Sequence, residues 1–155
     1  MSVFLDTSVI LAGLVDFGPQ SAPAQSLMHA VAEKRVVGPA TAWHCCLEFF
    51  SVATRLPPEF RVTPADAVTL LEEEVFARMA VHDLPAVDRL PMLRGAAHDA
   101  IAGGRIYDSH IADVARASGA RVVDTDNRRH FVSALRYDLR VETPAEFLAR
   151  LGKAK

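Results

Sequence analysis

The sequence predicts an α/β fold, with a mostly parallel sheet covered by helices on both faces. Short apolar segments of strand length alternate with longer segments of helical periodicity along the chain. Glycine and proline pairs at residues 18–19, 38–39 and 103–104 separate several of these segments. Strands that alternate with helices enter a sheet from the same edge, and the expected sheet is therefore parallel.

Local signals place the ends of the predicted elements. The first apolar run ends at Asp6, and Thr63 with Pro64 supplies an N-cap and a first helical residue. Gly119 is a typical helix stop, and residues 143–146 have the capping-box pattern that opens a last helix. We therefore expect strands at residues 2–5, 35–37, 79–82, 121–124 and 139–141, and helices at residues 9–15, 22–34, 40–55, 64–78, 86–102, 107–118 and from 143 onward.

The composition is that of one globular domain. The chain has 155 residues, of which 50% are hydrophobic and 23% are charged, and this allows one sizeable core. The formal net charge of −2 does not indicate the basic surface on which sequence-independent phosphate binding usually depends. Nucleic acid is not excluded, because bound divalent cations would offset a local cluster of acids.

Three features favour a cytoplasmic protein that does not associate with membranes. Cys45 and Cys46 are adjacent and poorly placed for a structural disulfide, so we expect both to be reduced. The first residues lack the pattern of a signal peptide. No apolar stretch approaches the roughly 18 residues of a transmembrane helix.

Acidic side chains occur where a parallel sheet places its ligands. Asp6 ends the first strand and residues 124–127 end a later one, so both groups are expected at the rim formed by the carboxyl ends of the strands. Asp108 lies in the first turn of a helix, and Glu48 lies on a polar helical stripe that faces either water or a cleft. Each acid also has a structural explanation: an N-cap for Asp6, the helix dipole for Asp108 and a turn for residues 124–127. Asp113 is off the apolar stripe of its helix and is expected to be solvated.

In their order along the chain, these segments resemble the motifs of PIN domains. The resemblance rests on Asp6-Thr7-Ser8, on Glu48 within an apolar helix, and on residues 107–112 and 125–131. It implies a PIN-like three-layer α/β/α sandwich with a mostly parallel central sheet, formed as a single domain over residues 1–155. The small architecture is similar to that of VapC-type toxins of bacterial toxin–antitoxin pairs. The resemblance therefore implies a metal-dependent endoribonuclease that cleaves RNA phosphodiester bonds.

The implied site is a group of carboxylates around Mg²⁺ or Mn²⁺, which prefer hard oxygen ligands. We expect four carboxylates to converge in one pocket, with two of them as the primary metal ligands. The family's fourth acidic position falls on either Asp126 or Asn127. Arg128 and Arg129 either contact phosphates or are solvated. The predicted catalytic residues are Asp6, Glu48, Asp108 and Asp126, the metal ligands Asp6 and Asp108, and the substrate-orienting residues Thr7, Thr125, Asn127 and Arg129.

The predicted partners are an RNA substrate, a cognate antitoxin that covers the acidic cleft, and a second copy of the chain in a homodimer. A catalytically weak PIN-like RNA-binding or assembly module remains an alternative, because Asn127 brings no negative charge. A receiver-like phosphoacceptor is disfavoured, since the first strand ends in a single Asp and lysine occurs only at positions 34, 153 and 155. Zinc and nucleotide sites are also disfavoured, because the Cys/His spacing and Gly-rich loops that they require do not occur.

Overall fold

One parallel sheet organises the molecule. The computed structural model describes residues 2–153, apart from the side chains of residues 132, 133, 135 and 136. The sheet has five strands in the order β3-β2-β1-β4-β5, and every neighbouring pair is parallel. This confirms the predicted α/β class. The strands are β1 (Val3–Leu5), β2 (Ala40–Ala42), β3 (Ala80–His82), β4 (Val122–Asp124) and β5 (Arg140–Glu142).

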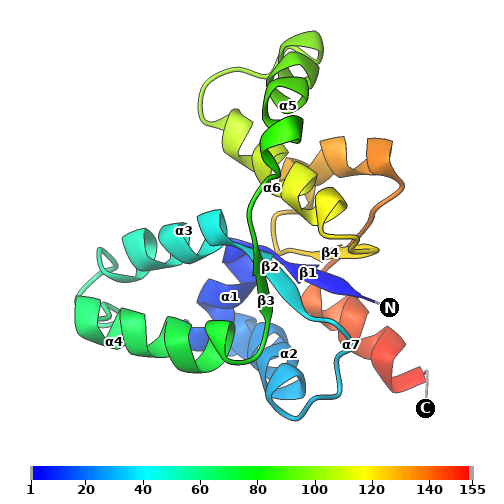
Figure 1. The fold of residues 1–155 in the computed structure, drawn as a ribbon. Coiled ribbons are helices and arrows are strands. Elements are labelled where there is room, and N and C mark those ends of the chain that lie inside the picture. Colours follow the sequence, from blue (N-terminus) through cyan, green and yellow to red (C-terminus); the bar gives the residue numbers. More distant parts are fainter. Residues whose placement is uncertain (1, 154–155) are drawn as a thin grey trace.

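Helices cover both faces of the sheet (Figure 1). α1 packs against α2, and α2 against α7, so these three helices form one layer. On the opposite face, α6 packs against the 3₁₀ segment η3, and α5 packs against α6. α3 and α4 project together from the β2 side (Figure 1). The helices are α1 (Thr7–Leu14), α2 (Ala22–Ala32), α3 (Trp43–Ala53), α4 (Pro64–Leu70), α5 (Ala86–His98), α6 (Arg105–Ala117) and α7 (Pro144–Lys153). The structure also has two 3₁₀ segments, η1 (Pro19–Ser21) and η3 (Arg128–Tyr137), and the π-helical η2 (Leu71–Phe76).

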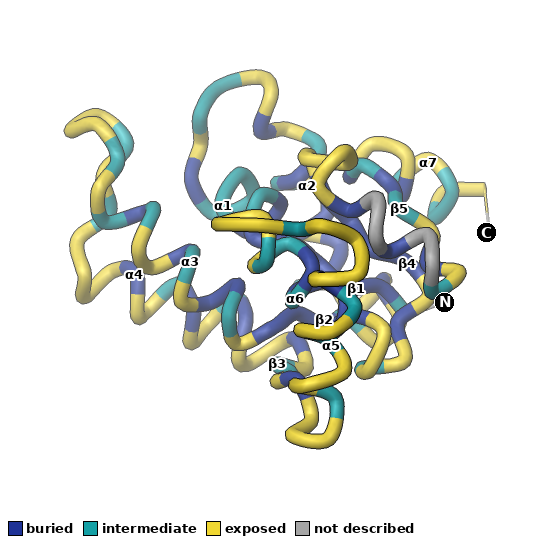
Figure 2. The backbone as a smooth tube through the Cα atoms, turned by 90° about the horizontal axis from the view of Figure 1, so that it is seen from above, coloured by how far each residue is buried: buried dark blue, intermediate teal, exposed yellow. Residues whose placement is uncertain are grey.

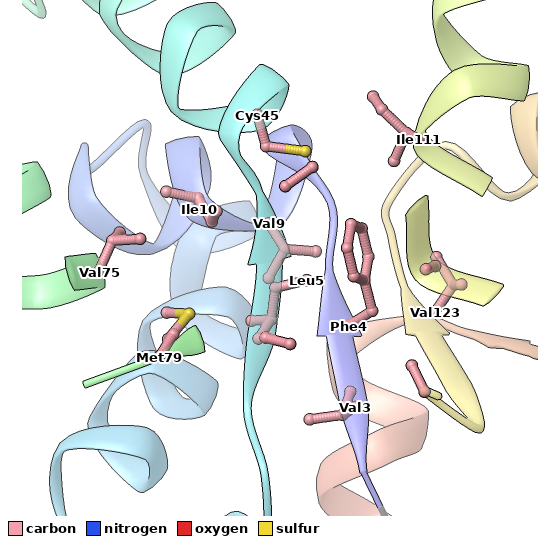
Figure 3. Packing of buried hydrophobic residues seen from close by; sticks show 14 of the residues in the cluster. Val3, Phe4, Leu5, Val9, Ile10, Cys45, Val75, Met79, Ile111 and Val123 are labelled. Carbon is pink, nitrogen blue, oxygen red and sulfur yellow. The ribbon is translucent and has the colours of Figure 1, made fainter. Parts of the chain in front are cut away.

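The core is centred on β1. Its three side chains, in Val3–Leu5, are fully buried, as expected for a central parallel strand with both faces covered. Figure 3 shows them with Val9 and Ile10 of α1 and with Ile111 of α6, which belong to the same buried cluster. Burial decreases away from the sheet, and α5 is exposed over most of its length (Figure 2). No helix within residues 2–153 combines the length and the apolar character that crossing a membrane would require.

The predicted strand at residues 35–37 is wrong. These residues form a bend between α2 and β2, in which Val36 is buried and Val37 is 68% exposed. Gly38 adopts a φ of 57°, and this turn delays the strand until Ala40. The strand then pairs with β1, and the buried hydroxyl of Thr41 donates a hydrogen bond of 2.8 Å to the carbonyl of Leu5.

Several predicted helices have different ends. β2 takes up the first residues of the segment 40–55, and α3 therefore begins at Trp43. The segment 64–78 divides into α4 and the π-helical turn η2, and α5 ends at His98 rather than at residue 102. The sequence also gave no signal for the 3₁₀ segment η3.

The prediction that Asp113 is solvated is wrong as well, since Asp113 is only 5% exposed. α6 lies on the sheet and is itself covered by α5 and η3. A helix packed on several sides buries more than one apolar stripe, and residues 111–115 are all buried.

Candidate acidic active site

The carboxyl ends of β1 and β4 bring two of the predicted segments together. The strands pair with Leu5 opposite Asp124, so Asp6 and Thr125 are the next residues on adjacent strands. The backbone N–H of Asp6 donates to the Asp124 carbonyl at 3.0 Å, which continues the ladder to the rim. Parallel pairing therefore creates this part of the site.

Hydroxyl groups from both strand ends hold the Asp6 carboxylate. Thr125 Oγ1 donates to Asp6 Oδ2 at 2.9 Å, and Ser8 Oγ donates to the same oxygen at 3.0 Å. Ser8 Oγ also accepts from the Asp126 backbone N–H, and Thr125 Oγ1 accepts from that of Asn127. Burial raises the pKa of Asp6, while the two hydroxyl donors oppose this shift.

Asp6, Glu48 and Asp108 form one electrostatic group, although they come from three separate elements. Burial is the main cause of the raised pKa of Glu48, and the charges of Asp6 and Asp108 raise it further. The charge of Asp108 also contributes to the raised pKa of Asp6. Carboxylates that repel one another in this way are stabilised by a cation, and their oxygen donors fit Mg²⁺ or Mn²⁺. Among the residues that the structure describes, no three His, Cys, Asp or Glu side chains are already arranged as a metal site.

Histidines accompany two of these acids. His44 Nε2 lies 2.8 Å from Glu48 Oε1, although the contact does not meet hydrogen-bond geometry. His130 Nδ1, from η3, lies 3.7 Å from Asp108 Oδ2. Burial raises the pKa of Asp108, and the charges of His130, Arg105 and His44 oppose that shift.

Asp126 lies in a different electrostatic environment from the other predicted acids. The residue as a whole is exposed, but partial burial of its carboxyl raises the pKa of Asp126. The charge of Asp126 in turn raises the pKa of Asp124. Asn127 is exposed beside it. The charge of Asp126 therefore acts on Asp124, while its backbone N–H contacts Ser8, the residue that also holds Asp6.

The remaining predicted site residues divide between the core and the surface. Thr125 is buried and binds Asp6, as described above. Thr7 is also buried, but its hydroxyl is next to the Cys45 thiol, and Ser8 supplies the contact with Asp6. Arg129 is exposed, and its neighbour Arg128 forms an ion pair with Glu146 of α7.

Asp124 is an acid whose setting the sequence did not reveal. It has no exposed surface, and neither carboxylate oxygen has a hydrogen-bond partner among the described residues. Burial, followed by the charges of Asp126 and Glu142, raises its pKa to about 8. Glu142 is opposite Asp124 on β5 and is held by Arg150 of α7 at 3.0 and 3.2 Å. Burial and the neighbouring carboxylates therefore favour the protonated form of Asp124.

Sequence reasoning also missed three residues at the site: Ser8, His44 and His130. Ser8 and His130 belong to the two segments that resemble PIN motifs, and this was the available signal. His44 is one helical turn before Glu48 on the same stripe, a spacing at which side chains meet.

Comparisons with known proteins agree with this geometry. Residues 2–129 match the sequence profile of the PIN domain family. Ribonuclease VapC27 of Mycobacterium tuberculosis is 36% identical over 89 residues, which cover 57% of this chain and 63% of VapC27, less than two thirds of its length. Ribonuclease VapC40 of the same species is 29% identical over 131 residues, which cover 79% of this chain and 85% of VapC40.

A solved structure has the same fold. VapBC2 from Rickettsia felis, bound to a DNA fragment from its promoter, superposes with a TM-score of 0.62 at 16% identity. The superposition covers 92% of this chain and 98% of that one. The matched profile, the parallel sheet and the acids at its rim together show that the chain belongs to the PIN domain family.

Proposed function

We propose that this protein is a metal-dependent endoribonuclease of the VapC type. The observation that carries the proposal is the mutual electrostatic influence of Asp6, Glu48 and Asp108, three acids that the fold gathers from distant segments. The ribonuclease names of the relatives VapC27 and VapC40 support the choice of RNA as substrate. The proposed primary metal ligands are Asp6 and Asp108, with Glu48 completing the group directly or through water.

The residues of the chain have separable roles in this reaction. Asp6 is fixed by Thr125 and Ser8, so one ligand oxygen is positioned before the substrate arrives. Asp108 and Glu48 are more exposed and can adjust when the cation is bound. Bound Mg²⁺ or Mn²⁺ would lower the pKa of a water molecule and neutralise charge on the phosphate.

The segment after β4 is proposed to bind the RNA backbone. The exposed side chains of Asp126, Asn127 and Arg129 lie beyond Thr125, on the loop that holds Asp6. Arg129 can contact a phosphate, and the amide of Asn127 would orient the substrate. Asp126 would add a carboxylate to those that hold the cation.

The cellular role that we propose is that of the toxin of a toxin–antitoxin pair. The support is the VapC names of the relatives and the VapBC complex among the similar structures. An antitoxin segment over the acidic cleft would block RNA. A homodimer is supported by exposed apolar side chains around a cavity of about 340 Å³ between α3 and α4, which include Trp43, Leu47, Phe50, Val68 and Phe76.

The test is cleavage of a panel of single-stranded and structured RNAs by the purified, antitoxin-free protein. We expect cleavage with Mg²⁺ or Mn²⁺, its loss in EDTA, and its return when metal is added back. Asp6→Asn should abolish cleavage and leave the fold intact, whereas Asp66→Asn, at an exposed position in the first turn of α4, should not affect it. Metal-independent cleavage, or a fully active Asp6→Asn, would contradict the proposed mechanism.

A second function, an RNA-binding or assembly module without catalysis, is favoured by one observation. Asn127, which carries no charge, is one of the two candidates for the fourth acidic position, and the other, Asp126, is exposed and acts on Asp124. The same experiment separates the two functions. A folded protein that binds RNA but cuts none of the panel, with or without metal, would support the module.

A further inference from the structure

An exposed aromatic ring lies beside the acidic cluster without a role in the chemistry proposed above. Tyr107 precedes Asp108 in the first turn of α6 and is 54% exposed. Consecutive helical side chains diverge by roughly 100°, so the ring flanks the carboxylate of Asp108 without covering it. An exposed tyrosine at this position loses the stabilisation that a buried one would provide, and it invites a functional explanation.

One face of the Tyr107 ring is already supported. The imidazole of His44 stacks on it with ring centroids 5.3 Å apart and an angle of 12° between the planes. The His110 ring, one turn further along α6, is nearly perpendicular to the same imidazole, with ring centroids 5.4 Å apart. Glu48 Oε1 lies 2.8 Å from His44 Nε2. Because these two further contacts hold the imidazole, the Tyr107 ring is supported before any ligand binds.

The stack adjoins the three acids on the side of α3 and α6. His44 Nε2 lies 2.8 Å from Glu48 Oε1 while its ring stacks on Tyr107, and Tyr107 directly precedes Asp108 in the first turn of α6. A nucleic-acid strand whose phosphate lies over Asp108 would therefore have a base within reach of the ring. The weak overall charge of −2 makes an uncharged contact valuable, because phosphate attraction alone has little basic surface to draw on.

We propose that Tyr107, supported by His44, is a base-stacking site that holds one unpaired nucleobase of the RNA beside the Asp6, Glu48 and Asp108 carboxylates. The ligand class is a single-stranded segment, since a base inside a duplex does not offer its face to a side chain. Stacking tolerates any base, so this contact positions the strand and leaves base choice to other groups. The inference rests on the ribonuclease function proposed above.

The test measures RNA binding separately from cleavage. Fluorescence anisotropy follows a labelled single-stranded RNA in Ca²⁺, with gel electrophoresis to confirm that the RNA stays intact. The variants are Tyr107→Leu, which removes the ring, and Tyr107→Phe, which keeps it. Leu90→Ala is the matched control, because Leu90 of α5 is 54% exposed, the same fraction as Tyr107, and has no part in the proposed site or dimer surface.

We expect Tyr107→Leu to weaken binding by about 5- to 150-fold, the range for the loss of one base stack. Tyr107→Phe and Leu90→Ala should bind like the wild type. An RNA with a single abasic nucleotide at the stacked position should bind the wild type more weakly than the intact RNA does. The same abasic RNA should bind Tyr107→Leu as well as the intact RNA does, because a direct contact makes the two losses non-additive. The Mn²⁺ affinity measured by calorimetry should be the same for Tyr107→Leu and the wild type.

Three results would overturn the inference. The first is RNA binding by Tyr107→Leu that equals that of the wild type. The second is a scan of abasic positions in the RNA in which no position is coupled to Tyr107. The third is a loss of Mn²⁺ affinity in Tyr107→Leu, which would show that the ring only supports the acids. A wild-type protein that binds RNA through Tyr107 but never cleaves it would instead contradict the proposed ribonuclease function.

Discussion

Asp124→Asn should stabilise the protein by an amount that grows with pH. The carboxyl of Asp124 has no hydrogen-bond partner among the described residues, and burial raises its pKa from 3.8 to about 8. The difference is about 4 pKa units, and each unit corresponds to about 1.4 kcal/mol. A raised carboxyl pKa favours the native state fully below about pH 4, and this advantage is lost as the pH rises towards 8, because the unfolded chain releases the proton first.

The asparagine side chain has the same shape and does not titrate. Between pH 5 and pH 8.5, the free energy of unfolding of Asp124→Asn should therefore rise relative to the wild type by roughly 4 kcal/mol at most. Water that enters when the acid ionises would reduce this figure. The assay is urea unfolding of both proteins at several pH values, with Asp66→Asn as the exposed control. A stability difference that does not change with pH would refute the argument that Asp124 is buried without a partner.

Other predictions concern the fourth acidic position and the packing of α1. If the amide of Asn127 limits the charge of the site, Asn127→Asp should tighten Mn²⁺ binding or raise the cleavage rate; weaker binding in calorimetry would count against that assignment. Gly13→Ala should cost about 1–3 kcal/mol, because the new Cβ would overlap Met28 Cγ and lie 3.1 Å from the Ala24 carbonyl oxygen. Gly95→Ala, in a helix with open space around it, should instead stabilise by up to about 1 kcal/mol. Chemical unfolding measures both changes, and equal effects at the two glycines would contradict the close approach of α1 to α2.

The sequence predicted the sheet better than it predicted its second strand. β1 and β4 are fully buried, so their apolar residues and the acids that follow are visible as a pattern. β2 is Ala-Thr-Ala, three residues without the composition of a strand, and its position depends on pairing with Phe4. The more hydrophobic pair Val36 and Val37 resembles a strand locally, but only Val36 reaches the core.

The acidic cluster could be anticipated because parallel strands end at one rim, which brings Asp6 and the β4 end together whatever the details of packing. The hydrogen bond from the Asp126 backbone to Ser8 and the effect of the Asp126 charge on Asp124 depend on the path of the chain after β4. The contact of His130 with Asp108 likewise requires the 3₁₀ segment η3. Such contacts are set by tertiary packing, and local sequence patterns carry little information about them.

The most direct test of the central account is a calorimetric titration of Mn²⁺ into the wild type, Asp108→Asn and Asp66→Asn. We expect saturable binding to the wild type and to Asp66→Asn, and a large loss of affinity in Asp108→Asn, because one of the repelling carboxylates that the cation stabilises is removed. Equal Mn²⁺ affinity in all three proteins, or no binding to the folded wild type, would contradict the claim that Asp6, Glu48 and Asp108 form a metal site.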